Sequence, residues 1–241
     1  MPQPRRRIRA VVFDLDDTLY RERDYVRSGF AAVGRALRAE RGTTADYEGW
    51  MWRRFADGRR EGTFDALSRR FGLGLSAAGV ARLVDFYRRH APDIRPCRGV
   101  PALLDGLRRG RRARLGLLSD GYLPAQRLKL AALGLADRFD AVVFTERLGR
   151  GAWKPSPRGF EAIRRRLGAP AAACAYVGDN PAKDFVAPNA LGWLTVQWRR
   201  PGQVHADRPA PPGGRPGRVV RSGPELLRLL AAPPPARPAV T

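Results

Sequence analysis

The feature that most restricts the fold is an alternation of short apolar runs with helical segments in the second half of the chain. Beyond residue 100, segments with the apolar spacing of helices separate runs typical of strands, which span 114–119, 140–145, 173–178 and 193–198. A similar run, 8–13, lies near the start. Strands separated by ten or more helical residues indicate strand–helix–strand units. The sequence therefore predicts an α/β fold, with a parallel sheet and helices on both faces.

Residues 21–95 have a different pattern, with helical spacing and no clear strand. Thr63 and Ser76 are the expected N-caps of two of these helices, because short hydroxyl side chains accept hydrogen bonds from free backbone N–H groups. A turn-rich stretch, 91–96, ends the region. The predicted helices span 25–42, 46–56, 63–71 and 76–90. We therefore expect a helical domain, 21–95, inserted into a discontinuous core made of 1–20 and 96–232.

Proline and glycine dominate two further segments. Residues 201–218 are predicted to form a flexible connector, and residues 233–241 a disordered tail. The two cysteines, Cys97 and Cys174, are too few for a disulfide scaffold or a four-cysteine zinc site. No apolar run approaches the length of a membrane span. We expect a cytoplasmic protein without a membrane segment, either a monomer or a homodimer.

The formal net charge of +22 suggests a nucleic-acid partner as one hypothesis. Lysine, however, occurs only three times among the 45 basic residues, an imbalance typical of GC-rich codon usage. The positive charge is also spread along the whole chain and forms no basic arm or stripe. A solvated basic surface without a specific nucleic-acid site is therefore the preferred interpretation.

Polar motifs follow four of the predicted strands. In parallel sheets the carboxyl ends of the strands lie at one edge, where ligands bind. Each motif alone is also compatible with a turn or a helix cap. The motifs are Asp14–Thr18, Ser119–Gly121, Lys154–Pro155, and Gly178–Asn180 with Asp184 shortly after it. Together they predict a site that contains a hydroxyl, a lysine and several carboxylates.

The segments DLDDTL (14–19), LLSDG (117–121), WKPSP (153–157) and GDNPAKDF (178–185) resemble the four signatures of the haloacid dehalogenase-like hydrolase superfamily. The resemblance extends from residue 8 to about residue 200. It implies a Rossmann-like core, a helical cap inserted between the first two signatures, and the activity of a Mg²⁺-dependent phosphatase. One departure is Asp120, which stands where many members have asparagine.

The resemblance also implies catalytic roles. Asp14 would be the nucleophile that forms an aspartyl-phosphate. Asp16 would give a proton to the leaving oxygen and later accept one from water. We expect the neighbouring carboxylates to help keep Asp16 protonated, unless the metal and Lys154 offset their field. The residues that would bind the phosphoryl group are Ser119, Asp120, Gly121 and Lys154, and both Ser119 and Lys154 count among the catalytic residues.

A Mg²⁺ ion is the cofactor that the resemblance implies. Its expected ligands are Asp14, the backbone carbonyl of Asp16, and Asp179, because Mg²⁺ prefers a few oxygen ligands together with water and phosphate. Asn180 and Asp184 would orient these ligands or their waters.

The expected substrate is a small phosphorylated metabolite, whose identity the sequence leaves open. A phosphomutase would need the same residues and stays an alternative. A 2-haloacid dehalogenase would need neither an acid at Asp16 nor a metal carboxylate at Asp179, so the presence of both argues against it. From a different class, a basic nucleic-acid-binding protein on this fold would make Asp14 irrelevant.

Overall fold

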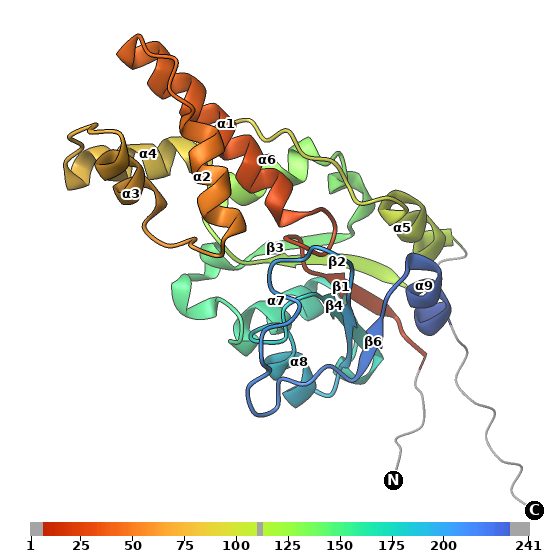
Figure 1. Ribbon diagram of the computed structural model, residues 1–241. Helices are drawn as coiled ribbons and strands as arrows, with labels where there is room; N and C mark the ends of the chain where they lie inside the picture. The colour runs from red at the N-terminus through yellow and green to blue at the C-terminus, as the bar shows by residue number, and fades with distance from the viewer. Residues whose placement is uncertain (1–6, 110–112, 232–241) are drawn as a thin grey trace, which may run out of the picture.

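The computed structural model describes residues 7–109 and 113–231 (Figure 1). At its centre lies a six-stranded sheet in the order β3-β2-β1-β4-β5-β6, with every neighbouring pair parallel. The strands are β1 (Ala10–Phe13), β2 (Arg114–Ser119), β3 (Ala141–Phe144), β4 (Cys174–Gly178), β5 (Leu194–Trp198) and β6 (Arg218–Val220). This order is that of Rossmann-like folds, so the predicted α/β fold class is confirmed.

Helices cover both faces of the sheet, which explains why its strands consist of continuous apolar runs. Val11 and Phe13 of β1 pack into one apolar cluster, with α5 (Val100–Arg108), α6 (Leu123–Ala132) and α9 (Gly223–Ala231). Ala10 and Val12 face the opposite way, toward α7 (Pro157–Leu167) and α8 (Val186–Ala190). Short 3₁₀ helices complete this part of the fold at Ala136–Arg138, Thr145–Leu148, Arg150–Ala152 and Ala171–Ala173.

The remaining helices form a group at one end of the sheet, which we call the helical insertion (Figure 1). They are α1 (Glu22–Arg41), α2 (Tyr47–Ala56), α3 (Thr63–Arg70) and α4 (Ala77–Arg89). Their apolar faces share a separate cluster that includes Phe30, Met51 and Leu67. The chain enters and leaves the insertion along adjacent paths, because Tyr20 forms a β-bridge with Pro96.

One of the two predicted N-caps is wrong. Ser76 caps α4 by accepting a hydrogen bond from the N–H of Gly79. The N-cap of α3 is instead Gly62, whose φ of 57° lies in the left-handed region that glycine adopts without strain. The Thr63 hydroxyl donates to the carbonyl of Arg60 at 2.9 Å, so Thr63 is the first helical residue and not the cap.

The Pro/Gly-rich segment 201–218 is not the flexible connector predicted from its composition. Gln197 donates to the carbonyl of Ala206, and Asn189 donates to the carbonyls of Gly213 and Arg215. These amide side chains, which lie outside the segment, tie it to the sheet, and its last residue already belongs to β6. The predicted tail, 233–241, lies outside the described residues.

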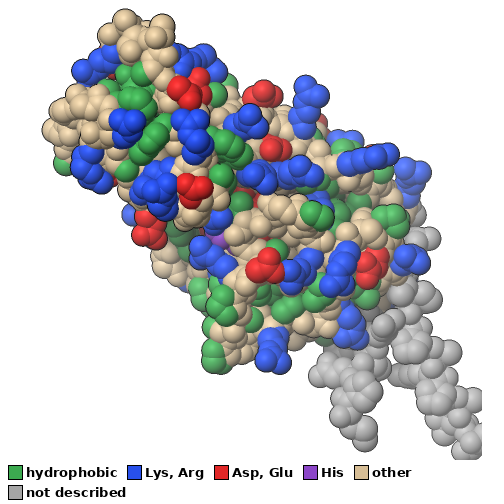
Figure 2. Space-filling model, viewed as in Figure 1, with side chains coloured by type: hydrophobic (Ala, Val, Ile, Leu, Met, Phe, Trp, Pro, Cys, Tyr) green, Lys and Arg blue, Asp and Glu red, His purple; other side chains and the backbone are tan. Residues whose placement is uncertain are grey.

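Within the described ranges, no helix is both long and apolar enough to cross a membrane. Lysine and arginine side chains are scattered over the face of the molecule shown in Figure 2, with neutral and hydrophobic surface between them. This distribution agrees with the spread of positive charge along the sequence.

Candidate active site

The carboxylate of Asp14 lies directly after β1 and is buried. Lys154 Nζ is 2.5 Å from Asp14 Oδ1 and 2.8 Å from Asp184 Oδ1, and it also donates to the Tyr176 hydroxyl. Burial lowers the pKa of Lys154, but the adjacent Asp14 and Asp184 carboxylates outweigh this effect and raise the pKa well above its ordinary value. Lys154 is therefore a buried cation with two anionic partners.

A cluster of carboxylates surrounds this lysine. Oxygen atoms of Asp14, Asp179 and Asp184 all lie within 4.8 Å of one another. Burial raises the pKa of Asp179 well above its ordinary value, and Asp184 and Asp14 add to the effect. Burial likewise raises the pKa of Asp14 to about 7, although Lys154 acts in the opposite direction. Ionisation of all three carboxylates would therefore give the cluster more negative charge than Lys154 alone neutralises.

One atom of this cluster is left without a partner. Asp179 Oδ2 is buried and accepts no hydrogen bond from the described residues. An unpaired buried carboxylate oxygen is costly, and a cation would remove that cost. Carboxylate oxygens are the ligands that Mg²⁺ takes, so the donor set fits the ion that the sequence predicts.

Asp184 differs from Asp179 because both of its oxygens already have partners. Oδ1 receives Lys154, and Oδ2 accepts the backbone N–H of Asn180 at 2.9 Å. Its approach to the main chain requires glycine at position 178, where a Cβ would lie 2.4 Å from Asp184 Oδ2. The geometry thus makes Asp184 a residue that holds Lys154 and the Gly178–Asn180 turn.

The residues of the Ser119–Gly121 motif follow β2. Ser119 Oγ donates to Gln126 Oε1 at 3.0 Å. The Asp120 carboxylate accepts from the Thr145 hydroxyl at 2.8 Å and from the backbone N–H of Lys154. The side chain of Asp120 therefore anchors the loop that carries Lys154. A phosphate contact from Asp120 would have to come from its main chain.

Gly121 is required by its surroundings. Its φ is +118°, and a Cβ at this position would lie 2.7 Å from Gln126 Nε2. A side chain here would displace Gln126, the residue that contacts Ser119.

Asp16 lies apart from the carboxylate cluster, among hydrogen-bond donors. Lys129 Nζ is 2.7 Å from its Oδ1, Gln126 Nε2 is 3.1 Å from its Oδ2, and the Tyr20 hydroxyl also donates to it. Burial raises the pKa of Asp16, but Lys129 and the two hydrogen bonds from Lys129 and Tyr20 together lower it below its ordinary value. The expectation that neighbouring carboxylates keep Asp16 protonated is therefore wrong, because its closest charged neighbour is a lysine.

Gln126, Lys129 and Tyr20 were not among the predicted site residues. The first two lie on α6, one helical turn apart, so they face the same side. The scarcity of lysine was a signal that could have found Lys129. The three lysines of the chain are Lys129, Lys154 and Lys183, and the Nζ atom of Lys183 lies 3.6 Å from Asp120 Oδ2. All of them therefore contact a carboxylate of the predicted motifs.

The loop that follows β5 supports the Asp14–Thr18 motif. Asp17 has a φ of 53°, unusual for a residue with a side chain, and its main-chain oxygen accepts from Gln203 Nε2 at 2.7 Å and from Arg200 Nη2 at 3.2 Å. Its carboxylate accepts the backbone N–H groups of Glu22 and Val204. The conformation of the Asp14–Thr18 turn thus depends on residues almost 190 positions away.

The family model for haloacid dehalogenase-like hydrolases matches residues 8–192. Glyceraldehyde 3-phosphate phosphatase of Methanopyrus kandleri is 33% identical over 207 residues, which cover 80% of this chain and 84% of that protein. Phosphoserine phosphatase of Thermus thermophilus is 36% identical over 115 residues, covering 48% of this chain and 44% of that protein. The HAD-hydrolase YfnB of Bacillus subtilis, solved with magnesium, has a similar fold, with a TM-score of 0.65, 21% identity, and coverage of 94% of this chain and 100% of that one. The chain belongs to the haloacid dehalogenase-like hydrolases.

Proposed function

We propose that this hydrolase is a Mg²⁺-dependent phosphatase that acts on a small phosphorylated metabolite. One observation carries the proposal: the buried Asp14 carboxylate contacts Lys154 and lies within 4.8 Å of Asp179, which has an unpartnered oxygen. The set combines a nucleophile, a fixed cation and a site for a second cation, which together can neutralise a phosphoryl group. The phosphatase names of two relatives support the same reaction.

In the first step of the proposed reaction, an oxygen of Asp14 attacks phosphorus and the bond to the ester oxygen breaks. Asp16 gives its proton to the leaving oxygen, and the product alcohol departs, leaving an aspartyl-phosphate and an ionised Asp16. In the second step, water attacks that phosphorus and gives its proton to Asp16, so that Asp14 is released with inorganic phosphate. Once Asp16 has given up its proton it is well placed for the second step, because Lys129 stabilises its ionised form.

The other predicted residues support these steps. The Lys154 ammonium offsets the charge of Asp14 as the phosphoryl group approaches. The Ser119 hydroxyl and the main-chain N–H groups of Asp120 and Gly121 would donate to phosphoryl oxygens. A Mg²⁺ ion held by Asp14, the Asp16 carbonyl and Asp179 would supply positive charge to the same oxygens.

We further propose that the helical insertion is a cap domain, residues 21–95, on a core made of 1–20 and 96–232. Its helices follow the catalytic turn directly, since α1 begins at Glu22. A cap in this position excludes bulk water and restricts entry, which favours a small ester over a phosphoprotein.

The test is phosphate release from a panel of phosphorylated metabolites. With Mg²⁺, the wild type should hydrolyse small esters, and chelation should abolish the activity reversibly. The Asp14→Asn variant should fold normally and keep less than about a tenth of the wild-type rate. Asp137→Asn, a matched change at an exposed position, should be fully active. Full activity in excess chelator, or in Asp14→Asn, would refute the proposal.

A further inference from the structure

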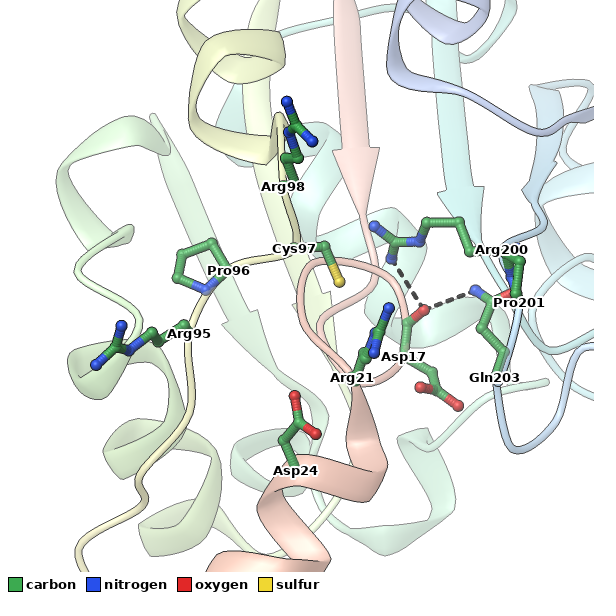
Figure 3. A pocket seen from close by; sticks show the side chains of 10 residues that line it. All are labelled: Asp17, Arg21, Asp24, Arg95, Pro96, Cys97, Arg98, Arg200, Pro201 and Gln203. Carbon is green, nitrogen blue, oxygen red and sulfur yellow. Dashed lines mark hydrogen bonds between the residues drawn. The ribbon is translucent and has the colours of Figure 1, made fainter.

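A second pocket lies at the junction between the helical insertion and the core, outside the carboxylate cluster (Figure 3). Its volume is about 380 Å³. One wall is formed by Arg21 and Asp24, where the chain enters the insertion, and another by 95–98, where the chain leaves it. Residues 200–203, from the loop that holds the catalytic turn, close a third side together with Asp17. We call this the junction pocket.

The charges around the junction pocket are mainly positive. Four arginines, including Arg21 and Arg200, and two aspartates line it. In Figure 3 the guanidinium groups of Arg21 and Arg200 lie near the sulfur of Cys97, whereas the other two arginine side chains point away from it. Both Arg200 and Arg21 also act electrostatically on Cys97, which agrees with this arrangement. Two cations therefore face the interior of the pocket.

The carboxylate of Asp17, which also lines the pocket, forms no ion pair with either arginine. The oxygens of Asp17 are occupied by the backbone N–H groups of Glu22 and Val204. Among the described residues, no side chain forms an ion pair with Arg21 or Arg200. Arg21 is exposed, whereas Arg200 is partly buried, and a partly buried charge without a counter-ion is costly.

The lack of a counter-ion is clearest at Arg200. Its Nη2 donates to the main-chain oxygens of Asp17 and Thr18, which carry no formal charge. Its Nη1 is buried and has no hydrogen-bond partner. Its guanidinium carbon lies 4.3 Å from the centroid of the Trp198 ring, which fixes the plane of the group. Arg200 is thus held in a fixed orientation, without an anionic partner, beside a second guanidinium.

We propose that the junction pocket binds a phosphate group, held between Arg21 and Arg200. Guanidinium groups bind tetrahedral oxyanions through paired N–H donors, and a dianion matches two facing cations. The volume of the pocket accommodates a free phosphate or a small phosphorylated molecule. The proposal goes beyond the hydrolytic reaction and does not depend on it.

Occupancy of this site bears on the catalytic turn. A bound phosphate would connect both linkers of the helical insertion with Arg200, which holds the main chain at Asp17 and Thr18. Suppose that the insertion can take two orientations relative to the core and that phosphate binds one of them more tightly. Phosphate binding must then raise the population of that orientation. The junction pocket is therefore a site through which phosphate can regulate the enzyme.

Cys97 provides a local probe of the pocket, since it lines the wall and is partly exposed, whereas Cys174 is buried. The experiment measures the rate at which a neutral disulfide reagent modifies Cys97 in the native chain, followed by mass spectrometry of the Cys97 peptide. Inorganic phosphate is titrated at constant ionic strength and in the presence of chelator. Chelation keeps binding at the proposed metal-dependent site from contributing. Phosphate should slow the modification in a saturable way.

Two matched arginine variants separate the pocket from the general basic surface. Arg21→Gln should raise the phosphate concentration needed for half-protection about tenfold, because one charge-assisted pair of donors is lost. Arg35→Gln removes the same charge from an exposed position on α1, the helix that Arg21 precedes, and should leave protection unchanged. Methylphosphonate, which cannot be hydrolysed, tests the alternative source: protection by methylphosphonate alone would identify an organic phosphate as the ligand, and protection by both would identify free phosphate as sufficient.

Three outcomes would overturn the proposal. They are unchanged reactivity of Cys97 at saturating phosphate and phosphonate, equal protection by chloride at the same ionic strength, and equal behaviour of Arg21→Gln and Arg35→Gln. None of these outcomes bears on phosphatase activity, which is measured separately by phosphate release.

Discussion

The carboxyl edge of the sheet and the helical insertion are held together by different interactions. At the edge, Lys154 and Asp184 are buried polar groups with specific partners at hydrogen-bond distance. In the insertion, most of the buried side chains are aromatic or aliphatic and pack against one another, as Phe30 does with Phe64. Buried charges require one residue type at each position, whereas apolar packing requires mainly the right volume. Substitutions should therefore be judged by chemical identity in the first region and by size in the second.

The largest expected effect is at the edge, where Lys154→Met leaves Asp14 and Asp184 without their cation. We expect at least about a 10³-fold loss of kcat/KM, and a loss of about 3–5 kcal/mol in unfolding free energy. Lys183→Met is the matched control, because Lys183 is more exposed and its Nζ lies 3.6 Å from Asp120. Lys183→Met should lower the unfolding free energy by no more than about 1 kcal/mol. Equal effects of the two variants would show that burial does not distinguish these lysines.

Asp16→Ala should damage catalysis in a way that depends on the leaving group. With an alkyl phosphate, the leaving oxygen needs a proton, and we expect a loss of about 10²-fold or more. With nitrophenyl phosphate, whose leaving group departs as an anion, the loss should be about tenfold or less when the first step limits the rate. The measurement is kcat/KM for both esters. An equal loss of kcat/KM with both esters would show that Asp16 does not transfer a proton to the leaving group.

The helical insertion should tolerate a change that conserves volume. Met51 is fully buried among the insertion's apolar residues. Met51→Ala should lower the unfolding free energy by about 2–5 kcal/mol, whereas Met51→Leu should cost less than about 1.5 kcal/mol. Urea denaturation measures both. If Met51→Leu were as damaging as Met51→Ala, the insertion would depend on residue identity as the sheet edge does.

The smallest expected effect is a pH dependence that originates in the insertion. His90 is buried, its Nδ1 donates to the carbonyl of Tyr87, and the Ser28 hydroxyl donates to its Nε2. Burial lowers the pKa of His90 below its ordinary value of 6.5. The unfolded chain therefore takes up a proton before the folded chain does, so stability present above pH 6.5 is lost as the pH falls toward the folded-state pKa. In His90→Gln this loss should shrink, as measured by urea denaturation at neutral and mildly acidic pH. An identical pH profile in both proteins would exclude His90 as its source.

The sheet and its polar edge were predictable because strand periodicity and strand-end motifs are local in sequence. The sequence placed Asp14, Ser119 and Asp179 at strand ends, where the structure has them. The partners of Asp16 were not predictable in the same way. Gln126 and Lys129 lie inside a helix, and only the packing of α6 against the Asp14–Thr18 turn brings them to Asp16.

The error over residues 201–218 has a related cause. A high content of proline and glycine predicts the conformation of a segment that makes no contacts with the rest of the protein. Here the segment is held by amide side chains. Gln197 lies on β5 and Asn189 on α8, and both donate to main-chain oxygens of the segment, whereas Gln203 lies within the segment and donates to Asp17. Composition does not reveal hydrogen bonds between residues that only the fold brings together.

The central position of β1 has a consequence for biosynthesis. This strand is translated before both of its neighbours in the sheet, β2 and β4, and its Ala10 pairs with Cys174. The helices α1–α4, in contrast, contact one another within a continuous stretch of chain and can associate soon after they are made. The loop that holds Asp17 is translated later still. Asp14 is thus synthesised well before the residues that surround it in the folded protein, and its surroundings are complete only after the segment that contains Val204 has been translated.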